Sequence, residues 1–439
     1  MDTLPLETLQ EILDWLPLED QPTSRLTCKL FAEMIPRTPE YQRHLGLVTD
    51  DPKLISQAIS RKPRYANTIC DRAASKGSLE VLKWAKSKGY SLGSDVCGNA
   101  AMNNHMHVLE WARVNDCPLD ESTCESAAES GHLHILKWAR ANDYPWDERT
   151  CMFAAEGGHL EVLQWAQANG CPWDGSTCES AAERGHIHIL QWARANGCPW
   201  DETTCVFAAK SGHLEVLQWA RANHCPWGSG VCAWAAANGD MRILKWARDN
   251  GCPWDTWTCA NAAENGHLEV LQWARANDCP WNERTCMRAA ENGHLEILQW
   301  ARANDCPWNE RTCMSAAEYG HIHILQWARA NGCSWDAWTC AYAAHNGYMH
   351  ILEWAWSNGC PWNEHTCSYA ALNGHLGIIQ WARDNGCPWD ERTCLFAAKT
   401  GRTEILKWAR ENGCPWNSQE CLRISENRPR IQEWIRQNM

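Results

Sequence analysis

The chain has 439 residues and a formal net charge of −13 at pH 7, and it contains 26 Cys and 30 Trp but only 4 Phe. Nucleic acids and anionic membrane surfaces bind through a basic stripe, and none is present here, so we expect neither as a partner. No run of about 18 apolar residues occurs, which argues against a membrane-spanning helix.

The N-terminal stretch, residues 1–16, carries acidic residues early and has no cationic segment of the kind that begins a secretory signal. We therefore expect a cytoplasmic location, with the nucleus as an alternative, or the cytoplasm of a host cell if the source is a virus. In those compartments cysteines are kept reduced.

Residues 3–36 are predicted to form two short helices separated by a break at Leu16-Pro17. The apolar positions of the first helix are Leu6, Leu9, Ile12, Leu13 and Leu16, which lie on one face. The second helix starts after Asp20 and carries Leu26, Leu30 and Phe31. Two helices of this size cannot form a stable core, so we expect their apolar surface to meet a partner.

This segment resembles an F-box domain, which we place at residues 1–40. The matching motifs are Leu4-Pro5-x-Glu7, Ile12, Leu16-Pro17-x-x-Asp20 and Cys28-Lys29-x-Phe31, whereas Gln21 and Thr27 replace apolar residues of the family. The resemblance implies docking onto a Skp-type adaptor of a cullin–RING ubiquitin ligase. The residues implied in that contact are Leu4, Pro5, Ile12, Leu16, Pro17 and Phe31. The alternative is that these helices form only a hydrophobic cap on the following segment.

An internal repeat occupies most of the remaining chain. One Cys recurs every 27 residues from Cys70 to Cys421 without an insertion, so every copy should have the same backbone. A Trp keeps the same interval from Trp84 to Trp408, which defines thirteen units at residues 70–416. We expect residues 41–69 to be a linker with a degenerate capping repeat, and residues 417–439 to be a C-terminal cap.

Each copy is predicted to contain two short helices, as residues 282–308 illustrate. Asn282 is placed to cap the first helix, and Gly293 to end it in the left-handed conformation. The small residues Cys286, Ala289 and Ala290 form a stripe on that helix. The second helix should run over about residues 294–304, before Pro307. Such pairs bury their apolar faces only by stacking, so we expect an all-α fold, with the N-terminal helices followed by an α-solenoid.

The unit is similar to the ankyrin repeat. Copy 178–204 carries the shared residues Ala181-Ala182, Gly185-His186, Gly197 and Asp201. It is about six residues shorter than the ~33-residue ankyrin unit, and the missing residues fall where that family has a β-hairpin finger. Trp192 and Arg194 also replace a Leu pair of the family, so we expect the second helix to be rotated relative to its ankyrin counterpart. The resemblance implies a compact array without fingers that binds another protein.

The repeated Cys, His and Trp residues are of types that can form metal, redox or catalytic sites. Each unit carries two families of cysteine. Consecutive cysteines such as Cys171 and Cys178 are seven residues apart, farther than the ligands of a zinc knuckle, and Tyr90 and Tyr144 replace members of the second family. We interpret the cysteines as small buried residues, with a metal or redox array as the alternative. The repeated His is expected to bind a neighbouring backbone, and the Trp to pack between units. We expect no catalytic residue, metal ligand or cofactor.

Binding is expected where the copies differ, because a repeat array varies its binding face on a constant scaffold. The candidate target-binding residues are Phe207, Trp234, Trp257, Tyr319, Trp338, Tyr342, Tyr369 and Phe396. The last five should form one group, and the first three a second group. Clustered aromatic residues are typical of binding hot spots, although a half-buried, tolerant position is the alternative reading.

Together these features predict a non-enzymatic, monomeric adaptor that joins a target protein to a ubiquitin ligase. An F-box combined with ankyrin-type repeats indicates a eukaryote or a large DNA virus that infects one. The main alternative is an interaction scaffold with no ubiquitin role, and a remote one is a metal-storing array.

Overall fold

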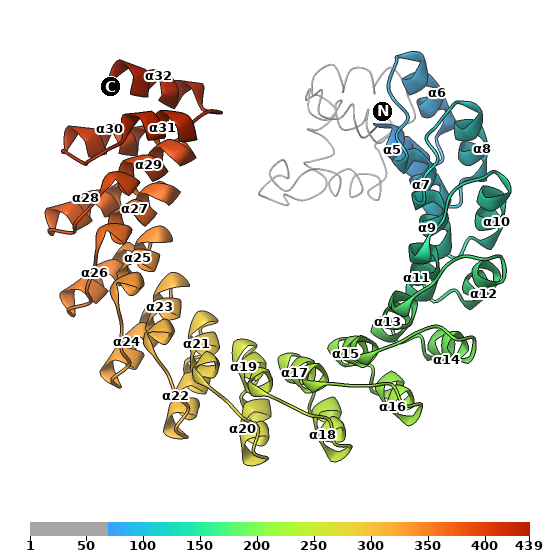
Figure 1. The fold of residues 1–439 in the computed structure, drawn as a ribbon, viewed down its shortest axis with the longest axis horizontal. Coiled ribbons are helices and arrows are strands. Elements are labelled where there is room, and N and C mark those ends of the chain that lie inside the picture. Colours follow the sequence, from blue (N-terminus) through green and yellow to red (C-terminus); the bar gives the residue numbers. More distant parts are fainter. Residues whose placement is uncertain (1–68) are drawn as a thin grey trace, which may run out of the picture. The chain divides into compact units, whose positions relative to one another are not determined.

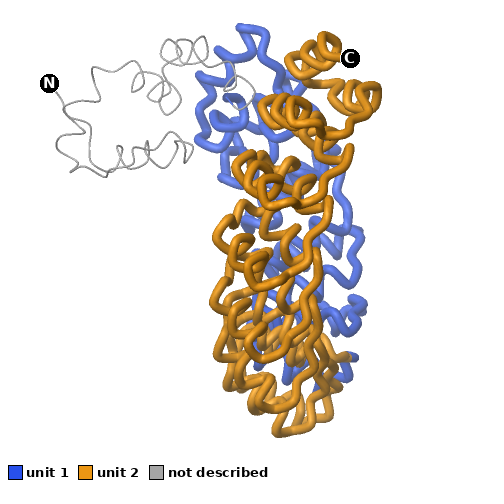
Figure 2. Tube along the Cα trace, turned by 90° about the vertical axis from the view of Figure 1, so that its left-hand side faces the viewer, with its two compact units in different colours: residues 1–226 blue, residues 227–439 orange. Residues whose placement is uncertain are grey.

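The computed structural model describes residues 69–439, and every regular element in that range is an α-helix. The chain divides into two compact units between Pro226 and Trp227, which Figure 2 shows in blue and orange. Helices occur in pairs, and each pair occupies one 27-residue copy. None of the helices in the described range is long and apolar enough to cross a membrane.

The first unit contains six helix pairs among its described residues. They are α5 (Ile69–Ser75) and α6 (Leu79–Ser87), α7 (Asp95–Met102) and α8 (Met106–Val114), α9 (Ser122–Glu129) and α10 (Leu133–Ala141), α11 (Glu148–Glu156) and α12 (Leu160–Ala168), α13 (Gly175–Glu183) and α14 (Ile187–Ala195), and α15 (Glu202–Lys210) and α16 (Leu214–Ala222).

The second unit contains eight helix pairs. They are α17 (Ser229–Ala237) and α18 (Met241–Asp249), α19 (Thr256–Glu264) and α20 (Leu268–Ala276), α21 (Glu283–Glu291) and α22 (Leu295–Ala303), α23 (Glu310–Glu318) and α24 (Ile322–Ala330), α25 (Ala337–His345) and α26 (Met349–Ser357), α27 (Glu364–Asn373) and α28 (Leu376–Asp384), α29 (Glu391–Thr400) and α30 (Thr403–Glu411), and α31 (Ser418–Ile424) and α32 (Pro429–Gln437). The last pair lies in the segment expected to be the C-terminal cap.

The local signals in the sequence begin and end these helices as expected. The Asn282 side chain accepts a hydrogen bond from the backbone N–H of Arg284 at 3.1 Å, which caps α21. Gly293 follows α21 with φ +82°, and Asp305 takes the same left-handed conformation after α22 with φ +64°. The predicted boundaries of the two helices in this copy are therefore confirmed.

Small side chains allow the first helices of neighbouring copies to pack closely. Within each unit these helices lie next to one another along one side, and the second helices along the other (Figure 1). Cys286, Ala289 and Ala290 on α21 are fully buried. On α22 the buried residues include Leu298, and burial of such a side chain contributes about 1.5–3 kcal/mol. The α-solenoid expected from the repeat is thus confirmed within each unit.

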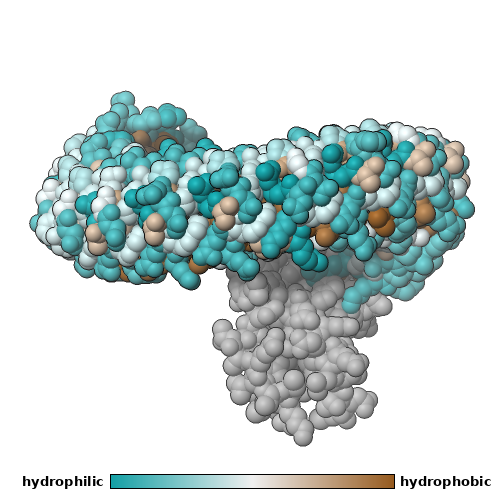
Figure 3. Space-filling model, turned by 90° about the horizontal axis from the view of Figure 1, so that it is seen from below, coloured by the Kyte–Doolittle hydropathy of each residue, from teal (hydrophilic) through white to brown (hydrophobic). Residues whose placement is uncertain are grey.

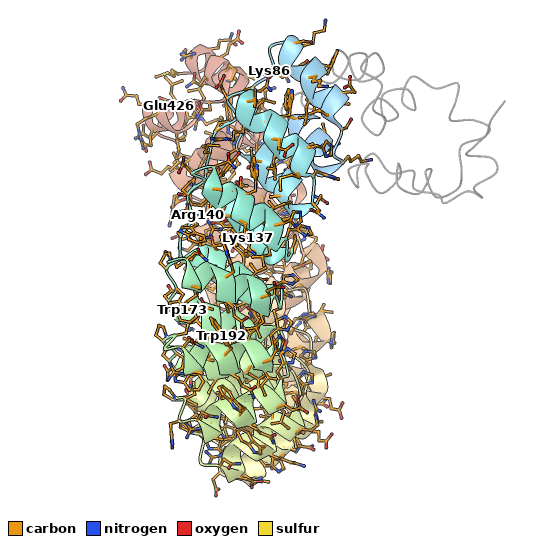
Figure 4. The ribbon with its side chains drawn as sticks, turned by 90° about the vertical axis from the view of Figure 1, so that its right-hand side faces the viewer. Lys86, Lys137, Arg140, Trp173, Trp192 and Glu426 are labelled. Atoms are coloured by element: carbon orange, nitrogen blue, oxygen red, sulfur yellow. The ribbon has the colours of Figure 1, made fainter. Side chains whose placement is uncertain are left out.

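Tryptophan rings join consecutive copies beside the second helices. Trp173 precedes α13, and its ring centroid lies 5.7 Å from that of Trp192 on α14, as can be followed in Figure 4. The Arg194 guanidinium lies 4.2 Å from the ring centroid of Trp200, which in turn contacts Trp219. Trp200 is thus held between a cation of one second helix and a ring of the next, and the same arrangement recurs in most copies that have an Arg at the position of Arg194. The expectation that Trp packs between units is confirmed.

The repeated histidines bind the backbone of the preceding copy. His321 Nε2 lies 3.1 Å from the carbonyl oxygen of Glu291, and the equivalent contact of His294 is made to Glu264 at the same distance. The imidazole also packs on the glycine of that copy, because a Cβ on Gly293 would lie 2.9 Å from His321 Cε1. These histidines therefore have the structural role that the repeat predicted.

The close approach of His321 to Gly293 can be tested with two matched substitutions. Gly293 and Gly332 have nearly the same φ, +82° and +83°, but a Cβ at Gly332 would meet nothing within 4 Å. Both Gly→Ala changes lower the free energy of unfolding by about 1–2 kcal/mol, because alanine disfavours the left-handed conformation. We expect G293A to lose about 1 kcal/mol more because the imidazole must move. Chemical denaturation measures this difference, and equal midpoints for the two variants would show that the His contact is not tight.

Candidate functional site

The aromatic residues expected to form one group come together on the first helices of the second unit. Trp338 and Tyr342 lie on α25, Tyr369 on α27 and Phe396 on α29. The ring centroid of Tyr369 lies 5.7 Å from that of Trp338, 6.0 Å from that of Tyr342 and 6.4 Å from that of Phe396. Residues 27 positions apart become neighbours because the copies stack without an offset.

Two histidines belong to the same group, although they were not among the predicted target-binding residues. The His365 ring stacks on Trp338 at 4.6 Å between centroids with an interplanar angle of 17°, and His345 lies 5.5 Å from Tyr369. Both occupy sequence positions that vary between copies, and this variation could have identified them as candidate binding residues. We name the aromatic cluster as Trp338, Tyr342, His345, His365, Tyr369 and Phe396.

The rings of the aromatic cluster are half-buried, and their contacts are mainly with one another. Burial, together with the nearby charge of Glu318, raises the pKa of Tyr342 above its usual value. Burial also lowers the pKa of His345, which keeps that imidazole neutral at pH 7. Tyr342 and His345 are therefore uncharged at pH 7 and lie near the carboxylate of Glu318, while the Arg392 guanidinium lies at the edge of the cluster, 3.4 Å from His365 Nδ1.

The carboxylate of Glu318 has no cation in the position where other copies supply one. Equivalent glutamates bind a base of the following copy, as in the pairs Glu183–Lys210 at 3.0 Å and Glu264–Arg288 at 3.5 Å. After Glu318 the corresponding positions hold Tyr342, His345 and Asn346. Within residues 69–439 Glu318 forms no ion pair, and burial and the nearby Glu291 raise its pKa.

Tyr319 lies beside this carboxylate rather than within the rings. It follows α23 directly, and its side chain is 48% exposed. Burial and the charges of Glu291 and Glu318 raise the pKa of the Tyr319 hydroxyl. In the described part of the chain, no ring contact joins Tyr319 to the aromatic cluster.

The second expected group is divided between the two units. Phe207 lies on α15 in the first unit, with the Lys210 ammonium 5.2 Å from its ring centroid. Trp234 and Trp257 lie on α17 and α19 in the second unit and are 39% and 41% exposed. The Arg284 guanidinium covers the Trp257 ring at 4.8 Å. Phe207 and Trp257 therefore each have a cation of this chain against the ring.

A further aromatic group lies beside the second helices and was not expected from the sequence. Trp356 on α26 replaces the Arg of other copies, and its ring lies 5.6 Å from Trp362 and 5.7 Å from Trp381. The replacement of Arg by Trp at position 356 could have identified this group from the sequence.

The molecular face in Figure 3 is mainly hydrophilic with small, separated hydrophobic spots.

The cysteines lie in contacts that the sequence reasoning did not consider. All 25 cysteines in the described range are buried free thiols. Cys97 Sγ lies 3.4 Å from Cys117 Sγ, and the two residues are 20 positions apart within one copy, unlike the consecutive cysteines Cys171 and Cys178. No group of three His, Cys, Asp or Glu side chains that could hold a metal ion occurs in residues 69–439.

The implied adaptor-binding residues fall outside the described part of the chain. They are Leu4, Pro5, Ile12, Leu16, Pro17 and Phe31. The linker and degenerate capping repeat expected at residues 41–69 also lie there, apart from Ile69, the first residue of α5.

The raised pKa of Glu318 predicts a pH-dependent effect on stability. The pKa of Glu318 is higher in the folded state than in the unfolded state, where it is about 4.3. The folded state therefore favours the protonated acid, and the free energy of unfolding falls as the pH rises from the unfolded pKa through the folded pKa. We expect E318Q to be more stable than the wild type at pH 7, by less than about 1 kcal/mol, since the group is only half-buried and solvent screens its charge. The gain should vanish below about pH 4.

Thermal unfolding at several pH values measures this effect, with E264Q as the matched control. Glu264 has an ion pair with Arg288, so E264Q should be equal to or less stable than the wild type at pH 7. A loss of stability in E318Q at pH 7 would contradict the absence of a partner for this carboxylate.

Comparisons with known proteins identify the segment that precedes the helical array. The model of the F-box domain family matches residues 1–42. A search of the curated proteins found no match. Among solved structures, the crystal structure of the human ASB11 ankyrin repeat domain is similar, with 13% sequence identity and a TM-score of 0.34, covering 41% of this chain and 97% of that one. The chain thus carries an F-box domain at residues 1–42, as its motifs predicted, followed by an α-solenoid of 27-residue helix pairs.

Proposed function

We propose that this protein is a non-catalytic, substrate-recruiting adaptor of a cullin–RING ubiquitin ligase. The observation that carries the proposal is the F-box domain at residues 1–42, joined in one chain to a repeat array with an aromatic cluster. The F-box would bind a Skp-type adaptor, and the array would hold the target protein. This protein would act as a monomer. This role places the protein in the cytoplasm or nucleus of a eukaryotic cell, or of a host cell if the source is viral.

The aromatic cluster and Glu318 together favour a basic side chain of the target. A guanidinium or ammonium group gains cation–π contact with Tyr or Trp rings and an ion pair with a carboxylate. Both are present around Tyr342, and no cation of the protein itself occupies this position in the described range. We therefore place an Arg or Lys of the target against Tyr342 and Glu318, with Trp338 and Tyr369 as the adjoining apolar contacts.

A scaffold without a role in ubiquitination remains the second candidate. The feature that favours it is the replacement of two apolar F-box positions by Gln21 and Thr27. A polar side chain at either position would weaken an apolar contact with the adaptor.

Binding to the Skp-type adaptor decides between the two candidates. In a pull-down with the purified adaptor, L16D should lose at least about tenfold in affinity, because it places a charge in an apolar contact. Q10D adds the same charge at a polar position of the same predicted helix and should bind like the wild type. If the wild type does not bind, or if L16D binds equally well, the ligase role is wrong and the scaffold remains.

The preference for a basic target residue can be tested with peptide pools. Labelled degenerate peptides with a central Arg, Lys or Gln are passed over the immobilised full-length protein. We expect the Arg and Lys pools to be retained several-fold better than the Gln pool. E318Q should remove the difference by loss of the ion pair, and Y342A by loss of the cation–π contact.

The control for this experiment is E264Q, because Glu264 already has Arg288 as its partner. This variant should retain the pools like the wild type. Equal retention of all three pools by the wild type would contradict the assignment of a basic residue, whereas adaptor binding would be unaffected.

A further inference from the structure

Eleven cysteine pairs recur along the array, one in each copy that contains both cysteines. The first member lies on the first helix, and the second lies 20 residues later, in the turn after the second helix. The sulfur atoms of Cys97 and Cys117 lie 3.4 Å apart and form a thiol–thiol hydrogen bond. The pairs at the equivalent positions of the other copies are Cys151 with Cys171, Cys178 with Cys198, Cys205 with Cys225, Cys232 with Cys252, Cys259 with Cys279, Cys286 with Cys306, Cys313 with Cys333, Cys340 with Cys360, Cys367 with Cys387 and Cys394 with Cys414.

The backbone holds the turn cysteine of each pair in a constant position. Cys171 Sγ donates to the carbonyl oxygen of Asp147 at 3.3 Å, and Cys306 Sγ makes the same contact with Asn282 at 3.6 Å. The carbonyl belongs to the residue that caps the first helix, one turn before the partner cysteine. The same contact occurs in all eleven copies. The second sulfur is thus fixed beside the first in every copy.

We propose that these eleven thiol pairs are oxidation sites, each of which a peroxide converts to a disulfide within its own copy. The two sulfur atoms of Cys97 and Cys117 are already in contact at 3.4 Å, and about 1.4 Å of approach would form the bond. Packing alone requires small side chains but does not require two thiols to face each other eleven times.

The reaction balances with a peroxide as the two-electron oxidant. The thiolate of one cysteine attacks a peroxide oxygen, which breaks the O–O bond and gives a sulfenic acid and one water molecule. The sulfur of the partner then attacks the sulfenic sulfur, forms the S–S bond and displaces the oxygen as a second water molecule. Two thiols and one hydrogen peroxide therefore yield one disulfide and two water molecules.

Four cysteines have no cysteine 20 residues before or after them in the sequence and serve as internal controls. Cys70 and Cys124 belong to copies in which Tyr90 and Tyr144 replace the turn cysteine, and no cysteine follows Cys421 at the required spacing. The fourth is Cys28, which precedes the repeats. Burial raises the pKa of Cys70 and Cys421 to about 11 and that of Cys124 to about 12, and the pKa of a paired thiol such as Cys151 is also raised, by the neighbouring Cys171 and by burial. The controls are therefore distinguished by the lack of a cysteine at the pair spacing and not by their pKa.

Each disulfide would link the first helix to the turn after the second helix. The cross-link closes a loop of about 20 residues and restricts the unfolded state of that copy. In a repeat array every copy stabilises its neighbours, so cross-links in most copies act together. Oxidation would therefore make the array that holds the target more resistant to opening.

The test counts thiols in the full-length protein. The reduced protein is treated with hydrogen peroxide, denatured in an alkylating reagent and weighed by intact-mass spectrometry, with and without dithiothreitol. We expect the number of alkylated thiols to fall from 26 to four, and to return to 26 after reduction. The thermal unfolding midpoint of the oxidised protein should rise.

Two single substitutions separate pairing from random oxidation. C306S breaks one pair and frees Cys286, so five thiols should remain after oxidation. C124S removes an unpaired cysteine, so three should remain. Twenty-six thiols after peroxide treatment, irreversible addition of oxygen atoms, cross-links between chains, or equal counts for C306S and C124S would each overturn the proposal.

Discussion

The close packing of the first helices is the constraint on which the rest of the structure depends. Cys286, Ala289 and Ala290 are fully buried, and their small volume lets the helices of consecutive copies approach each other. On the other side of each pair, Trp rings such as Trp281 and Trp300 occupy the space between second helices, with 5.9 Å between their centroids. Small residues on one side and large ones on the other keep every copy in the same orientation.

This constant orientation is also what builds the candidate site. A residue that changes on a first helix lies beside the equivalent residue of the next copy, so aromatic substitutions in consecutive copies merge into one surface. Tyr342 and Tyr369 are 27 residues apart and have ring centroids 6.0 Å apart. The same substitutions remove the cations that neutralise a glutamate elsewhere, which leaves Glu318 without an ion pair in the described range. One set of changes therefore creates both the apolar contacts and the charge for a basic target residue.

The residue types that first suggested metal or catalytic chemistry are used in several different ways. His321 binds a backbone carbonyl and packs on Gly293. The cysteines combine a packing role with thiol–thiol contacts such as that of Cys97 and Cys117. A single buried thiol would be explained by packing alone, whereas the repeated pairing gives these residues a chemical reaction as well. Scaffold and reactivity are therefore compatible in the same side chains.

The sequence by itself determined the repeat length, the helix pair in each copy, the caps at Asn282 and Gly293, and the F-box domain, because these depend on local backbone preferences and motif spacing. The sequence also predicted that Tyr342, Tyr369 and Phe396 are neighbours, since copies of equal length stack in register. Only the tertiary structure decided that Cys97 touches Cys117, that His365 stacks on Trp338, and that Glu318 has no ion pair within residues 69–439. These contacts join different helices, and they depend on how each helix is rotated against its neighbours, which periodicity does not specify.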